Sequence, residues 1–180
     1  MNLIVGAPIW LVAILFIALA GAAIEDAVRL RISNLTCGAI FLAAVVAMAL
    51  QGFSLSLWQN AVICLAILAV GMPAFAAGWF GGGDIKLLAA IGLWLDLNAA
   101  VGLVSAVFMA GGIVAIVYIT ARRVTRPNAP RSERARIPYG LAIVFGAILI
   151  FGIQLSQPPT KNSFIDHMKA VEAQHRRISE

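Results

Sequence analysis

The chain has 180 residues, of which 62% are apolar and 12% are charged, and its formal net charge is +5. Long runs of such apolar composition exclude an ordinary soluble domain and are typical of membrane spans. The basic residues cluster in loops between these runs, so the positive charge indicates membrane orientation rather than nucleic-acid binding. Cys37 and Cys64 lie inside apolar runs without metal-ligand spacing, and we interpret both as buried core residues.

Three apolar runs in the first half of the chain predict three membrane spans. The first run, 4–24, holds about 20 residues, which is enough to cross a bilayer. It has no basic segment before it and no convincing cleavage site, so we expect a retained span rather than a signal peptide. It ends in Glu25 and Asp26, and a short basic connection follows. The second and third predicted spans are 35–50 and 61–80.

A glycine-rich segment follows the third run. Gly81, Gly82 and Gly83 precede Asp84. Glycine lets the backbone leave helical geometry, and an aspartate just before a helical run is typical of a helix N-cap. The apolar segment 85–97 would span only about 20 Å as a helix, against about 30 Å for a bilayer core. We therefore expect a short fourth helix that begins below the membrane surface, with the glycine loop lining a wet cavity.

The last third of the chain adds two further spans and two polar segments. The predicted spans are 99–119 and 139–155, and the basic loop 120–137 between them holds six arginines against one glutamate. The sequence therefore predicts an all-α polytopic membrane protein. Its domain, 1–155, would contain about six transmembrane helices, with a Gly-rich loop and a short fourth helix. A polar tail, 156–180, would follow this domain.

Basic residues in short loops predict the orientation of these spans. The loops after the first, third and fifth runs hold lysine or arginine, and the loops after the second and fourth hold none. We therefore expect the former three loops in the cytoplasm and both termini outside. This arrangement places Asp26 and Asp84 at the cytoplasmic side and Asp96 at the opposite side.

Two carboxylates at one depth in a partly dry site are suited to aspartic proteolysis. Like charges in proximity do not both ionise easily, so one group holds a proton and acts as acid while the other activates water. The helix after Asp84 would stabilise negative charge there through its positive N-terminal end. Lys86 can reach the interface or add to this field. The simpler interpretation is a glycine-rich turn between two spans that Asp84 caps.

A second functional class stays open at this point. Intramembrane acids and glycine-broken helices also occur in ion- or proton-coupled transporters. The predicted placement of both acids near one membrane face, without a visible inverted repeat, favours the protease. His167 and His175 lie in the tail without a third ligand nearby, so we expect no metal and no cofactor.

The chain resembles the type IV prepilin peptidases, which are polytopic aspartic proteases with a GxGD motif. The segment Gly81–Asp84 fits that motif, and Ile85 with Lys86 fits its extended form. The segment from Asp26 to Asn34 is similar to the first-aspartate segment of the family, with Ser33 where proline often stands. Residues 138–140, Pro-Tyr-Gly, are similar to the entry of the last span in short members.

This resemblance implies a membrane-embedded endopeptidase with Asp26 and Asp84 as its catalytic residues. It would remove the short basic leader from prepilins and pseudopilins at the cytoplasmic face of the bacterial inner membrane. The larger family members carry paired Cys-x-x-Cys motifs and also methylate the trimmed pilin. This chain lacks those motifs, so it resembles the small peptidase-only type of tight-adherence (Flp) pilus systems, and the related archaeal preflagellin peptidases stay open.

The expected partners are the prepilin substrate and the lipid bilayer, with no nucleic acid. The substrate would lie with its apolar helix in the bilayer and its leader in the cytoplasm. We expect its extended cleavage site to pair with the backbone of Gly81, Gly82 and Gly83, because strand addition needs small side chains. Lys86 belongs to the same predicted substrate-binding group.

Cysteine labelling from either side of the membrane tests the predicted orientation. Labels in loop 120–137 should react from the cytoplasm, and labels in the tail 156–180 should react from outside, because arginine-rich loops stay in the cytoplasm. A cytoplasmic tail would show that the number of spans is wrong, most directly at the short fourth helix.

Overall fold

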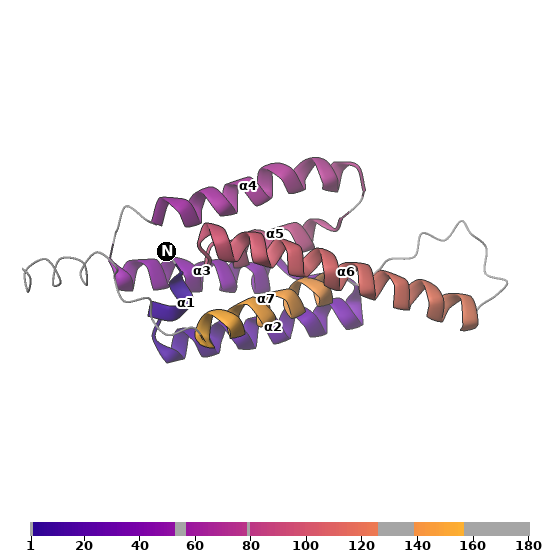
Figure 1. The fold of residues 1–180 in the computed structure, drawn as a ribbon, viewed down its shortest axis with the longest axis horizontal. Helices are drawn as coiled ribbons and strands as arrows, with labels where there is room; N and C mark the ends of the chain where they lie inside the picture. The colour runs from indigo at the N-terminus through magenta and orange to yellow at the C-terminus, as the bar shows by residue number, and fades with distance from the viewer. Residues whose placement is uncertain (1, 53–56, 79, 126–138, 157–180) are drawn as a thin grey trace, which may run out of the picture.

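The computed structural model describes residues 2–52, 57–78, 80–125 and 139–156. Every regular element within these residues is an α-helix, and Figure 1 shows the longer helices lying side by side along one long axis. The elements are α1 (Leu3–Gly6), α2 (Ile9–Arg29), α3 (Asn34–Gln51), α4 (Leu57–Ala76), α5 (Gly82–Gly92), α6 (Leu97–Thr125) and α7 (Tyr139–Ser156).

Five of these helices, α2, α3, α4, α6 and α7, are long and apolar enough to cross a membrane. Helix α5 has only 11 residues and is the predicted short fourth helix. The expectation of an all-α polytopic membrane protein is therefore confirmed. Helix α6 continues to Thr125 and so includes the first residues of the predicted loop 120–137. The rest of that loop, from residue 126, and the tail from residue 157 lie outside the described residues.

The first predicted span proves to be two helices. Helix α1 ends at Gly6, and α2 begins at Ile9 after Pro8. Proline lacks a backbone N–H and has a fixed φ, so it interrupts one helix but is well tolerated where the next begins. The prediction of one continuous span over 4–24 was therefore wrong. Helix α2 also continues past that run to Arg29.

The short helix α5 lies in the middle of the bundle, packed against α3, α4 and α7 (Figure 1). Its side chains Leu87 and Ile91 are fully buried, and Trp94 follows it with none of its surface exposed. The indole Nε1 of Trp94 donates to the carbonyl oxygen of Ile40 in α3 at 3.2 Å. Lipid is about as apolar as leucine, so these contacts stabilise the bundle by close packing more than by removal from water.

Polar contacts allow α5 to end within the bundle. The carbonyl groups of the residues that directly follow a helix have no partner within that helix, and an unpaired carbonyl is costly where water is absent. The buried amide Nδ2 of Asn60 in α4 donates to the carbonyl oxygens of Leu93 and Leu95, at 3.0 Å each. The backbone N–H of Leu3 in α1 donates to the carbonyl oxygen of Trp94 at 2.9 Å. These bonds explain how a helix shorter than the bilayer is stable here.

Substitution of Asn60 tests this explanation. Asn60→Leu keeps a similar volume but leaves the carbonyls of Leu93 and Leu95 without this donor, so we expect a loss of about 1–3 kcal/mol in the free energy of unfolding. Denaturant unfolding in detergent micelles measures it. The matched control is Asn98→Leu, because Asn98 is exposed in the first turn of α6. Equal stability of the two variants would contradict the role of Asn60.

Candidate functional site

Asp26 lies in the last turn of α2 and is almost fully buried, with 4% of its surface exposed. Its Oδ2 atom accepts a hydrogen bond of 3.0 Å from the backbone N–H of Leu141. Leu141 lies in the first turn of α7, where N–H groups have no partner within their own helix and the helix dipole is positive. The carboxylate of one span is therefore held by the start of another span, 115 residues later in the chain.

Asp84 lies in the first turn of α5, where its Oδ2 atom accepts a hydrogen bond of 3.1 Å from the backbone N–H of Gly81. Gly81 is extended and is the N-cap residue, so Asp84 stands at the third helical position. This is the reach-back contact of the acidic residue in a capping box. The expectation that Asp84 itself is the N-cap was wrong, and Gly82 and Gly83 belong to the helix rather than to a loop.

The fold brings the two predicted catalytic carboxylates together. Asp84 lies close enough to Asp26 for a direct electrostatic interaction between them. Asp96 follows the other end of α5, where its Oδ1 atom accepts a hydrogen bond of 2.9 Å from the backbone N–H of Ala99 and caps α6. Asp96 is thus a structural cap apart from the pair, as its position in the sequence predicted.

Ile32 packs between the two helices that carry this site, and its role was missed in the sequence. A Cβ atom at Gly83 in α5 would lie 3.2 Å from the Ile32 Cβ atom. A Cβ atom at Gly140 in α7 would lie 2.8 Å from the Ile32 Cδ1 atom and 2.8 Å from the Asp26 Cγ atom. Close approach therefore requires glycine at position 140 and favours it at position 83. The Pro-Tyr-Gly motif at 138–140 indicated that Gly140 matters, but it did not show that this glycine contacts Ile32 and Asp26.

A small polar network holds the connection that carries Ile32. One carboxylate oxygen of Glu25 accepts a hydrogen bond of 2.8 Å from the backbone N–H of Ser33, and both accept from the Thr36 hydroxyl at 3.1 Å. The Ser33 hydroxyl accepts from the backbone N–H of Thr36 at 3.1 Å and so caps α3. Ser33, the departure from the family pattern, thus supplies an N-cap that proline cannot provide.

The predicted substrate-binding residues lie around Asp84 in different environments. Gly81 is exposed, whereas a Cβ atom at Gly82 would lie 3.3 Å from the ring of Phe75 in α4. Lys86 is exposed, and its Nζ atom donates to the Oδ1 atom of Asn34 at 2.9 Å, which ties α5 to α3. The binding role of these residues, like the catalytic role of the two aspartates, stays a prediction.

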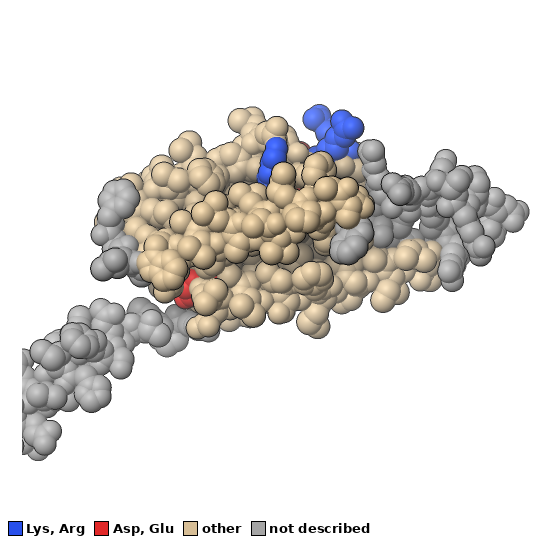
Figure 2. Space-filling view, turned by 90° about the horizontal axis from the view of Figure 1, so that it is seen from above, with Lys and Arg blue, Asp and Glu red and all other residues tan. Residues whose placement is uncertain are grey.

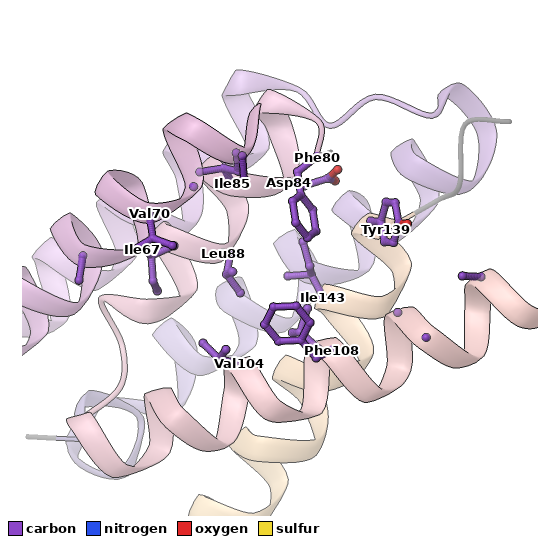
Figure 3. Close-up of a pocket in the computed structure, with 17 residues that line it drawn as sticks. Ile67, Val70, Phe80, Asp84, Ile85, Leu88, Val104, Phe108, Tyr139 and Ile143 are labelled. Atoms are coloured by element: carbon purple, nitrogen blue, oxygen red, sulfur yellow. The ribbon is translucent and has the colours of Figure 1, made fainter. Parts of the chain in front are cut away.

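A cavity of about 610 Å³ opens beside Asp84 (Figure 3). Asp84 and Tyr139 lie at one end of it, and the rest of its lining is apolar. The rings of Tyr139 and Phe80 lie with their centroids 5.5 Å apart at the same end. Asp26 does not line the cavity, so the pair has one buried carboxylate and one that faces open space.

Basic side chains gather at the end of the bundle that also holds Asp26 and Asp84. On the face shown in Figure 2, basic side chains lie toward one end and an acidic side chain toward the other. Arg29 and Arg31 stand at the end of α2 and just after it, and Lys86 lies near the start of α5. Within the described part of the chain, no three His, Cys, Asp or Glu side chains could hold a metal ion. His167 and His175 lie outside that part.

Comparison with known proteins gives one match. The model of the type IV leader peptidase family matches residues 13–116, which is more than half of the chain and includes both Asp26 and Asp84. The chain therefore belongs to the type IV leader peptidase family. No curated protein and no solved structure matches it.

Substitution of Gly140 tests the contact with Asp26. The added methyl group of Gly140→Ala would lie 2.8 Å from the Asp26 Cγ atom, so the carboxylate or the start of α7 must move. We expect peptidase activity to fall at least about 100-fold, because displacement of a reacting group by about 1 Å costs on that order. Gly152→Ala is the control on the same helix, where a Cβ atom meets nothing within 4 Å. Full activity of Gly140→Ala would contradict this geometry.

Proposed function

We propose that this member of the type IV leader peptidase family is a membrane-embedded aspartic endopeptidase. It removes short basic leaders from prepilins and pseudopilins at the cytoplasmic face of the inner membrane and does not methylate the product. The observation that carries the proposal is the meeting of Asp26 and Asp84 at one end of the bundle, with Asp84 facing an apolar cavity. The sequence has only two cysteines, which are too few for the paired Cys-x-x-Cys motifs of methylating members.

The proposed reaction is hydrolysis of a peptide bond with one proton shared by the two carboxylates. The ionised carboxylate takes a proton from a water molecule, while the protonated one donates its proton to the carbonyl oxygen of the substrate. The resulting tetrahedral intermediate collapses when its C–N bond breaks, and a proton passes to the leaving amine. The bonds from Leu141 and Gly81 orient Asp26 and Asp84 before the substrate arrives.

The cleavage site must be extended where it meets Asp84, and the start of α5 is suited to bind it. Gly82 and Gly83 lie in the first turn of that helix, where N–H groups have no acceptor within the helix itself. These donors can bind substrate carbonyl groups. Strand addition along Gly81 to Gly83 would require this turn to open, because the Gly81 carbonyl already accepts from the N–H groups of Asp84 and Ile85.

Basic residues support a cytoplasmic location for this end. Arg29, Arg31 and Lys86 all lie in the part of the chain near Asp26 and Asp84, and basic residues favour the cytoplasmic side. A substrate whose leader stays in the cytoplasm and whose helix lies in the bilayer would then present its cleavage site at this depth.

Asparagine substitutions test the proposed pair. Asp26→Asn and Asp84→Asn should each reduce prepilin cleavage by several orders of magnitude, because members of a catalytic unit fail together. The amide is nearly isosteric, so both variants should insert at normal abundance. The measurement is the size shift of a prepilin mixed with membranes that contain each variant.

Asp96→Asn is the matched control and should cleave almost normally, since asparagine also caps helices well. Normal cleavage by either variant of the pair would rule out the shared-proton mechanism. Proton flux through membranes that cleave no prepilin would favour the transporter instead.

A further inference from the structure

The cavity beside Asp84 is bounded by one face of α6 and one face of α4. The lining residues of α6 recur at helical spacing, so they form a single stripe along that helix, and a similar stripe runs along α4. The α6 stripe is Val104, Val107, Phe108, Gly111, Gly112 and Ala115. At 1.5 Å per residue this stripe is about 17 Å long, or roughly three helical turns.

The second half of α4, which forms one wall of this cavity, is largely exposed and meets the bundle through the start of α5, where Gly71 lies against Ile85. Every buried residue of α4 lies in its first half, between Leu57 and Cys64, whereas its lining residues begin at Ala66. Helix α4 packs mainly on α5 and makes few contacts with α6. The space between α4 and α6, seen in Figure 3, is therefore a groove between two helices that are both long and apolar enough to cross a membrane.

The end of this groove near the carboxylate has room for another backbone. A Cβ atom at Gly112 would meet nothing within 4 Å, and one at Gly111 would meet only the Tyr139 ring, at 3.7 Å. Glycines in a membrane helix that do not serve contacts within the protein leave a surface that a second helix can approach closely. The same end holds the polar atoms of Asp84 and Tyr139, for which a lipid chain has no partner.

We propose that this groove holds the apolar helix that follows the cleavage site of the substrate. The helix enters from the bilayer and lies along the α6 stripe, and its N-terminal end unwinds beside Asp84, where the bond is cut. Apolar helices bind grooves in this way through side chains on one face. This inference rests on the proposed function, and it makes Gly112 the residue that sets how bulky the substrate helix can be next to the cleavage site.

Crosslinking tests the groove without any cleavage. The protein carries Asp84→Asn to prevent turnover, Cys37→Ala and Cys64→Ala to remove its own thiols, and Gly112→Cys. A prepilin with one cysteine in the first turns of its apolar helix should form a disulfide with this variant under mild oxidation. Gly152→Cys is the matched control and should not react, because Gly152 is exposed on α7 outside the groove. Crosslinking only at position 152, or at neither position, would overturn the proposal, and the latter would leave lipid as the occupant.

Cleavage of two substrates gives an independent readout. One substrate is the full prepilin, and the other is a short peptide that spans the leader and cleavage site but lacks the apolar helix. Gly112→Leu should lower kcat/KM for the prepilin at least tenfold more than for the peptide, mainly through KM. Gly152→Leu should change neither substrate. Equal losses on both substrates, or normal prepilin cleavage by Gly112→Leu, would contradict the groove. If the wild-type protein cleaves neither substrate, the proposed function fails, while the crosslink still decides what the groove binds.

Discussion

The close packing around Ile32 is the constraint on which the site depends. The end of α2, the start of α5 and the start of α7 all reach this side chain or the carboxylate next to it. Two of the three meet it through glycine, where an added Cβ atom would lie 3.2 Å or less from Ile32. The position of each carboxylate therefore depends on the neighbouring helix ends as well as on its own helix. Glu25 and Ser33 contribute by holding the connection that carries Ile32.

A second constraint acts at the other end of the short helix. A helix of 11 residues places the Asp84 carboxylate at its start and its last carbonyl groups in apolar surroundings. Asn60 and the backbone of Leu3 bind the carbonyl groups of residues 93–95, which directly follow that helix, and so hold α1 and the first half of α4 against its end. These contacts hold the first half of α4, whereas its second half meets the start of α5 at Ile85 and Gly82.

Much of this architecture could be predicted because it depends on local composition. The long apolar runs predict the spans, and the short segment after Asp84 predicts α5. The exact ends of the helices could not be predicted where a single proline or capping residue decides them. Pro8 divides the first run, and an aspartate after glycines can cap a helix from the N-cap or from the third position, so the sequence of Gly81 to Asp84 does not choose between them. Helix α6 continues to Thr125, past its apolar run, and hydropathy alone does not mark where a helix of this kind ends.

The contacts that complete the site were beyond sequence reasoning for another reason. Asp26 and Leu141 are 115 residues apart, and the donor is a backbone N–H whose chemistry is the same in every residue except proline. Residue type carries no signal for such a contact. Gly140, which precedes Leu141, does carry a signal, because a side chain has no room there. The sequence does not show which residue occupies that space.

If the groove between α4 and α6 holds the substrate helix as proposed, its position determines how the protein encounters other molecules. A groove with walls made of membrane spans is reached by diffusion within the bilayer plane, so the encounter takes place in two dimensions rather than three. The relevant concentration is then the number of candidate helices per area of membrane. A cytosolic protein with the same leader sequence would not compete for the groove, however abundant it was. Only proteins embedded in the membrane would reach the groove, so substrates would be selected by their location before the protein contacts any side chain of the leader.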